Sequence, residues 1–260
     1  MNGVLAEIAN LLDLTEAYLG VAALVFVRVG AMVALLPGMG EQSVPQRVKL
    51  GIVLAFTAIV APVVAEGPLA GVALPGLTAL AAEAAAGLLL GIGFRLFILA
   101  LQTTASIIAQ ATTLSQLFAG AAPEPQPAIG NLLIMAGIAL AMSMGLHVRA
   151  AELILLSYAI LPADGLPDGA VVADWGLALI SATFSLSFSL AAPFVIASMI
   201  YNLALGAINR AMPQLMVSMV GAPALTLGAL AMMAVATPVL LTVWLQAFEA
   251  HLAQPFQVAP

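Results

Sequence analysis

Charged residues inside long apolar stretches are the first candidates for chemistry in this 260-residue chain. Arg28, Glu83 and Arg95 each lie in such a stretch. Within a membrane, a charge is costly unless it faces a protein interior, a wet cavity or an opposite charge. Because Glu83 and Arg95 are twelve positions apart, one helix would separate them by about 120° around its axis and about 18 Å along it. They cannot pair with each other, so the sequence favours structural ion pairs, with Arg28 or with neighbouring subunits, over a proton relay.

Other chemistries lack the residues they need. Cysteine is absent and the only histidines are His147 and His251, so we expect no metal site. The Gly91-Ile92-Gly93 stretch lacks the third glycine of a dinucleotide fingerprint, and there is no Gly-Lys phosphate loop. The serines between positions 181 and 189 have no neighbouring base to activate them. We therefore predict no catalytic residue and no cofactor, and a chain that is not an enzyme.

The composition indicates an integral membrane protein. Hydrophobic residues make up 63% of the chain and charged residues only 7%, with a mean hydropathy of +1.17. Soluble domains carry about a quarter charged residues. Six basic and twelve acidic residues give a net charge of -6, which excludes the dense basic patches that nucleic acid requires. Nucleic acid is therefore not an expected partner.

Three early apolar runs have the length of single membrane crossings, at about residues 18–36, 50–64 and 74–101. A loop at 41–49 carries Arg47 and Lys49 and is expected to face the cytoplasm. Residues 131–161 form a longer run whose second half contains His147 and other polar residues, so we expect that half to be interfacial or buried in protein. Gly87 and Gly91 have the spacing that lets helix backbones approach closely, although glycine is also simply common in this chain.

The last two apolar runs are too long to be straight spans. Asp174 and Arg210 bracket 35 uncharged residues, and Arg210 and Glu249 bracket 38, each more than about 50 Å if wholly helical. Pro193 divides the first run, and three further prolines divide the second. Since proline removes a backbone donor, we expect kinked helices or re-entrant hairpins whose freed polar groups are covered by other protein.

A proline-rich segment at about residues 112–127 must leave the helical path. Three prolines at alternate positions, 123, 125 and 127, forbid a continuous helix. Just before them stand the apolar residues Leu114, Leu117 and Phe118. The segment is either an ordinary connector or a plug that closes a passage by filling it and keeping it dry.

Several stretches in sequence order resemble the FliR family, called SctT in virulence-type secretion systems. The early stretches are Arg28–Met32, Val44–Leu50 and Ala61-Pro62, and the middle one begins at Ile129-Gly130-Asn131 and reaches His147. The most distinctive is the C-terminal stretch, where the family-like residues are Asn202, Gly206, Arg210, Pro213 and Gln214. The resemblance covers nearly the whole chain.

This resemblance implies an all-α fold of membrane-associated, kinked helical hairpins packed into a larger hetero-oligomeric export gate. It implies one integral membrane domain over residues 1–260, with N-terminal hairpins to about residue 128 that end in the plug-like loop, and C-terminal helices over about 129–260. Expected partners are FliP-like, FliQ-like and FlhB-like subunits in the inner membrane at the flagellar basal body, and exported flagellar proteins in transit.

The family's plug loop carries bulky apolar residues before a proline-containing turn, to which Leu114, Leu117 and Phe118 lie nearest. The surrounding residues depart from the family pattern. Two alternatives stay open from the sequence: a small-molecule secondary transporter with Glu83 and Arg95 at its site, and a membrane scaffold that conducts nothing.

Overall fold

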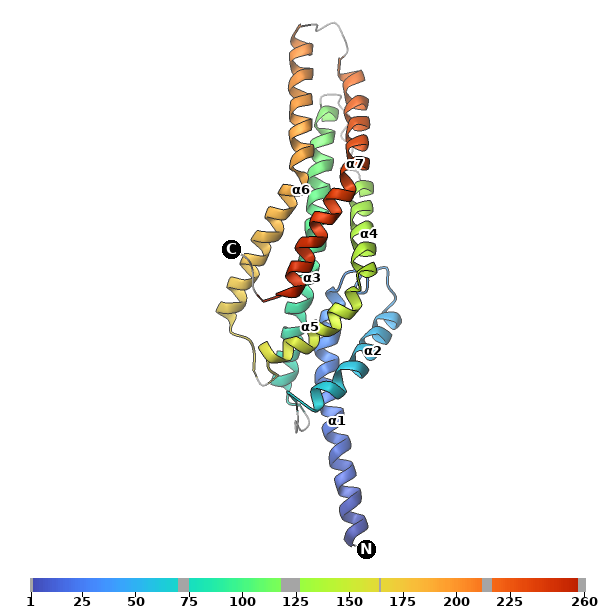
Figure 1. Ribbon diagram of the computed structural model, residues 1–260, viewed down its shortest axis with the longest axis vertical. Coiled ribbons are helices and arrows are strands. Elements are labelled where there is room, and N and C mark those ends of the chain that lie inside the picture. Colours follow the sequence, from blue (N-terminus) through green and yellow to red (C-terminus); the bar gives the residue numbers. More distant parts are fainter. Residues whose placement is uncertain (1, 70–74, 118–126, 164, 212–216, 257–260) are drawn as a thin grey trace. The chain divides into compact units, whose positions relative to one another are not determined.

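All regular secondary structure in the described part of the chain is α-helical. A computed structural model describes residues 2–69, 75–117, 127–163, 165–211 and 217–256. Within them, the helices (Figure 1) are α1 Asn2–Leu35, α2 Gln46–Ala65, α3 Leu77–Leu117, α4 Pro127–Ser143, α5 Leu146–Ile160, α6 Gly169–Ala211 and α7 Val217–Ala253. The predicted all-α class is confirmed.

Five stretches of the described helices are long and apolar enough to cross a membrane. The three N-terminal stretches coincide with the three early runs predicted from the sequence, and the two others lie in α6 and α7. The five stretches are Thr15–Leu35, Gln46–Ala65, Leu77–Ala111, Gly169–Ala211 and Leu227–Ala253. The pair α4 and α5 passes the same test only when taken together as one interrupted span. The chain therefore has the helices of an integral membrane protein.

The chain divides into two compact units, and each is described by itself. Unit 1 contains residues Met1–Arg95 and Met142–Gly176, and unit 2 contains Leu96–Ala141 and Leu177–Pro260. The first part of α3 belongs to unit 1 and its remainder to unit 2. Both units combine segments that are distant in sequence.

Unit 1 is built on the apolar face of α1. Val25, Val29, Met32 and Leu36 are fully buried and follow one another at spacings of three or four residues, as one helix face requires. A turn containing Gly38, whose φ of 78° suits a residue without a Cβ, leads from α1 toward α2.

The start of α2 corrects one expectation. Arg47 and Lys49 do not lie in a loop, because α2 already begins at Gln46. Pro45 precedes the helix with a φ of -58° and has no N–H to leave unpaired, which favours a helix start directly after it. The ammonium group of Lys49 donates to the carbonyl oxygen of Gly40 at 2.9 Å and ties the helix start to the preceding turn.

The run at 131–161 consists of two helices separated at Gly145. This glycine has a φ of 83°, a left-handed conformation that a residue with a Cβ rarely adopts. The second helix, α5, buries one face formed by Ala150, Leu153 and Ile154. Its polar residues His147, Arg149 and Glu152 are exposed, so the second half of the run is buried on one face only.

Unit 2 contains α7 and most of α6, whose residues up to Gly176 belong to unit 1. Helix α6 continues through Pro193 as one helix of 43 residues, about 64 Å long, and bends along its length (Figure 1). Helix α7 contains Pro223 and Pro238 without a break in its 37 residues. Both helices therefore continue through these prolines and bend, which is the first of the two expected outcomes. Pro213 lies outside the described residues.

Candidate functional site

A buried ion pair joins two helices of unit 1. The guanidinium of Arg28, in α1, donates from Nε to Oε2 of Glu83, in α3, at 2.6 Å and from one terminal nitrogen to Oε1 at 3.1 Å. Both side chains are fully buried. Such a two-pronged contact uses the fixed fork of arginine and both oxygens of the carboxylate. Arg28 and Glu83 therefore neutralise each other where water cannot reach them.

Helix α5 completes this cluster. Arg28 also donates to Oγ of Ser157 at 2.9 Å and to the carbonyl oxygen of Leu161 at 2.8 Å. The ring of Tyr158 lies under the guanidinium, with its centroid 3.7 Å from Cζ, and the tyrosine hydroxyl donates to Glu83 at 3.1 Å. Sequence reasoning did not single out Ser157 or Tyr158, since neither stands in a recognisable motif. We call Arg28, Glu83, Ser157 and Tyr158 the Arg28 cluster.

The arrangement separates the two residues on which a transporter site would depend. Arg95 pairs with Glu41 at 2.6 Å in a half-buried contact, and it has no part in the Arg28 cluster. Glu83 has both oxygens occupied by protein donors. The geometry gives no support to a proton relay or a solute site built from Glu83 and Arg95.

Gly87 and Gly91 lie where α3 crosses α1. A Cβ added at Gly87 would collide with the carbonyl oxygen of Arg28 and with the side chain of Ala31. A Cβ at Gly91 would come within 2.8 Å of the Cβ of Leu35. The absence of side chains at these positions lets the two helix backbones come close enough for the Arg28–Glu83 pair to form.

Neutral hydrogen bonds from side chains to backbone carbonyl oxygens join α3 to α6 and α7 in unit 2. The indole N–H of Trp244, in α7, donates to the carbonyl oxygen of Phe97 at 2.8 Å. The hydroxyl of Thr104 lies 2.8 Å from the carbonyl oxygen of Ala100 in its own helix and 3.3 Å from that of Ser187 in α6, so the two acceptors share its proton. Ser198 in α6 donates to the carbonyl oxygen of Ala111. The three α3 positions, 97, 104 and 111, are seven residues apart, which places them on one side of that helix.

Aromatic rings surround the Trp244 contact. The ring of Phe248 stacks on that of Trp244 at 5.2 Å, and Phe97 lies 5.4 Å from Phe248 and 5.1 Å from His251. His251 therefore belongs to an apolar cluster. Among the described residues, no group of three or more metal-ligating side chains comes together.

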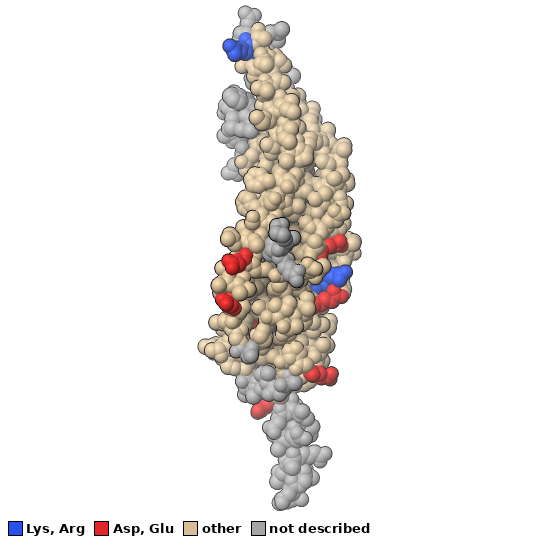
Figure 2. Space-filling view, turned by 60° about the vertical axis from the view of Figure 1, so that its left-hand side comes forward, with Lys and Arg blue, Asp and Glu red and all other residues tan. Residues whose placement is uncertain are grey.

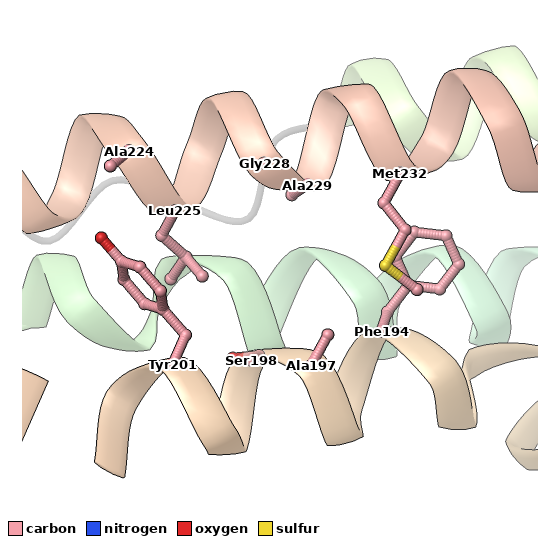
Figure 3. A pocket seen from close by; sticks show the side chains of 9 residues that line it. All are labelled: Phe194, Ala197, Ser198, Tyr201, Ala224, Leu225, Gly228, Ala229 and Met232. Carbon is pink, nitrogen blue, oxygen red and sulfur yellow. The ribbon is translucent and has the colours of Figure 1, made fainter. Parts of the chain in front are cut away.

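A small apolar hollow lies between α6 and α7 (Figure 3). It measures about 230 Å³, and its walls are mostly alanine and larger apolar side chains from both helices. The ring of Tyr201 and the side chains of Leu225, Phe194 and Met232 point into the space between the helices. The hydroxyl of Ser198 on its wall already donates to Ala111. The described lining residues of this hollow do not form a catalytic site, and the hollow is best explained as a gap in the packing of α6 against α7.

The remaining predicted site residues lie at or beyond the described ends of helices. Leu114 and Leu117 belong to the end of α3, but their side chains, like all of Phe118, lie outside the part of the chain that the structure describes. Asn202, Gly206 and Arg210 follow one another every four residues along α6. Pro213 and Gln214 fall in the undescribed residues 212–216.

The face seen in Figure 2 carries few charged side chains. Many large apolar side chains are exposed on the described helices. In α6 and α7 these include Phe184, Phe188, Met199, Leu203 and Val235, each more than half exposed. Only 17% of the span in α7 is buried, against 56% of the span in α3. Unit 2 thus leaves much of its apolar surface for something outside the chain to cover.

Comparison with known proteins gives a consistent result. The family model described as bacterial export proteins, family 1, matches residues 19–251. The chain is 36% identical over 232 residues to the flagellar biosynthetic protein FliR of Caulobacter vibrioides, covering 86% of this chain and 91% of that protein. It is 29% identical over 219 residues to the protein of the same name from Escherichia coli, covering 82% of each. A third FliR, from Pectobacterium carotovorum, is 27% identical over 209 residues, covering 78% of this chain and 79% of its own length.

Proposed function

Because the chain belongs to family 1 of the bacterial export proteins, we propose that it is a structural, pore-forming subunit of a flagellar type III protein export gate. The match along residues 19–251 carries this proposal, together with the FliR names of its relatives. As a member of a family of export components, the chain is not an enzyme. It belongs in the inner membrane, and we place it in the flagellar basal body.

The dimensions of unit 2 support a subunit that is surrounded by other proteins. Helix α6 is about 64 Å long, whereas the hydrocarbon layer of a membrane is about 30 Å thick. Within unit 2, its exposed apolar side chains extend from Leu177 to Ile208, about 46 Å along the axis, so lipid alone cannot cover them. FliP-like and FliQ-like subunits, with an FlhB-like subunit alongside, are the partners we propose for this surface.

In this proposal, conduction depends on shape and an apolar lining. Unfolded flagellar proteins pass through a pore shared with the partner subunits, and the driving energy comes from those partners. The Arg28 cluster has a structural part only: it holds α1, α3 and α5 together in unit 1.

Loss of the gene tests the proposed function. Cells without it should assemble no flagella and release no flagellar proteins into the medium, and the gene supplied on a plasmid should restore both. Normal secretion in the deletion strain would contradict the proposal.

For the transporter alternative, the purified chain in liposomes should carry a small solute, and Glu83→Gln should abolish that flux. We expect no flux from the chain alone.

The closed pore is sealed, in our proposal, by Leu114, Leu117 and Phe118 before the proline-rich segment. Deleting residues 117–126 should raise the ion permeability of growing cells while the complex still assembles. The control is Leu166→Ser, which changes an exposed apolar residue in the connection before α6. Unchanged permeability with normal secretion would contradict the plug. A scaffold that conducts nothing would instead tolerate every change in this segment.

A further inference from the structure

The cation of the Arg28 cluster lies well inside the first apolar span. This span runs from Thr15 to Leu35 in α1, and Arg28 stands about two helical turns before its end and further from its start. An arginine in the interior of a membrane-crossing helix opposes insertion by about as much as five to ten leucine or valine residues favour it. Helix α1 therefore carries a charge that works against its own insertion.

Few carboxylates follow Arg28 along the chain before Glu83. They are Glu41 and Glu66. Glu41 pairs with Arg95 at 2.6 Å, and Glu66 is exposed at the C-terminal end of α2. Neither belongs to an apolar span. Glu83 is thus the first carboxylate after Arg28 that lies within one of the spans.

The surface of α3 brings Glu83 against α1. Gly87, one turn after Glu83, lies so close to the carbonyl oxygen of Arg28 that a Cβ would collide with it. The side chains of Arg28 and Glu83 are both fully buried, and Glu83 also accepts a hydrogen bond from Tyr158. Docking of α3 therefore replaces an isolated cation in α1 with a neutral, hydrogen-bonded pair.

We propose that α1 is held across the membrane only after α3 has been made, because Glu83 supplies the counter-charge of Arg28. Since the chain is synthesised from its N-terminus, Arg28 leaves the ribosome 55 residues before Glu83. During that interval α1 is a weak span, and Ser157 and Tyr158 of α5 complete the cluster later. This inference concerns how the chain enters the membrane and goes beyond the proposed export function.

The test measures on which side of the membrane each end of α1 lies. The chain contains no cysteine, so a single cysteine can be introduced at Glu16, near the start of the span, or at Gln42, in the turn after α1; both positions are exposed. In the otherwise unchanged full-length chain, a membrane-impermeant maleimide should label the two positions from opposite sides. In Glu83→Gln, labelling of position 16 from its own side should fall about fivefold or more.

Two variants serve as controls. Glu41→Gln makes the same chemical change and leaves Arg95, in another span, without its carboxylate; Arg95 is 33% exposed, so labelling of position 16 should stay at the wild-type level. Arg28→Leu, alone or combined with Glu83→Gln, should also label as the wild type does, because α1 then has no charge to neutralise. Arg28→Leu thus separates insertion from folding, since it breaks the same ion pair.

Each result has a definite meaning. Loss of labelling in Glu83→Gln that Arg28→Leu restores would support the inference. Wild-type labelling in Glu83→Gln would overturn it, and so would equal losses in Glu83→Gln and Arg28→Leu, the result expected of a pair that only stabilises the folded chain. If cells degrade Glu83→Gln, the same labelling of full-length chains translated into protease-free membrane vesicles decides the question. The proposed export function is tested separately, by secretion from the deletion strain.

Discussion

Units 1 and 2 hold their helices together by different chemistry. In unit 1, one fully buried ion pair between Arg28 and Glu83 joins α1 to α3, and Ser157 and Tyr158 bring in α5. In unit 2, α3 is joined to α6 and α7 by hydroxyl and indole groups that bond to backbone carbonyl oxygens, as Trp244 does.

The two kinds of contact differ in what they require. A buried ion pair is stable only when every charge and donor around it is satisfied, and in the Arg28 cluster groups of α1, α3 and α5 do this within the chain. Neutral hydrogen bonds tolerate partial exposure, and the span in α7 is only 17% buried. The Arg28 cluster is thus complete within the chain, whereas the exposed apolar surface of α7 is a part that we expect partner subunits to cover.

The largest expected effect is loss of one member of the ion pair. Arg28→Leu leaves the carboxylate of Glu83 buried and without its cation, which should lower the free energy of unfolding by about 3–5 kcal/mol. Denaturation of the purified protein in mixed micelles measures it. The double variant Arg28→Leu/Glu83→Leu should recover much of the loss.

The control for that experiment is Arg149→Ala, which removes the exposed pair between Arg149 and Glu152. Exposed pairs contribute little, so this change should be close to neutral. If Arg28→Leu were no more destabilising than Arg149→Ala, the contrast between the units would disappear.

The second effect concerns the crossing of α1 and α3. In Gly87→Ala the new Cβ collides with the backbone of α1, so the helices must separate, at about 1–3 kcal/mol. Gly51→Ala, where nothing lies within 4 Å, should instead stabilise its helix by about 0.5–1 kcal/mol. The same denaturation measurement checks both, and equal signs for the two variants would contradict the close approach.

Unit 2 should respond less to loss of one polar contact. Trp244→Phe keeps a ring in the aromatic cluster and removes the N–H that bonds to Phe97, which should cost about 0.5–1.5 kcal/mol. The neighbouring exposed residue gives the control Val243→Leu, which should be near neutral. A loss for Trp244→Phe as large as that for Arg28→Leu would show that unit 2 also depends on one central contact.

The smallest effect is expected at Ser198. Ser198→Ala removes the hydroxyl that bonds to the carbonyl oxygen of Ala111, and such bonds between membrane helices average about 0.6 kcal/mol. Ser185→Ala, at an exposed position of the same helix, should change nothing. Thermal denaturation in detergent can compare the two. Equal losses would remove Ser198 from the contacts that hold α6 to α3.

Sequence reasoning predicted some parts of the site and missed others for definable reasons. Glu83 and Arg95 were separated by helical geometry alone, because two residues twelve apart on one helix face different directions. The four-residue spacing of Gly87 and Gly91 predicted a close helix contact, but it did not indicate which helix would lie against them. Trp244 was missed because its acceptor is a backbone carbonyl 147 residues away. Every residue has a backbone carbonyl, so the sequence does not indicate which one accepts the bond.

The sequence by itself determined the membrane class and that the two long C-terminal runs could not be straight single spans. These follow from composition and from local rules, since apolar length and proline act on the residues beside them. Only the tertiary structure decided that Glu83 pairs with Arg28 and Arg95 with Glu41. The physical reason is that an ion pair depends on a distance of a few ångströms between side chains from different helices, and that distance is set by how the helices pack.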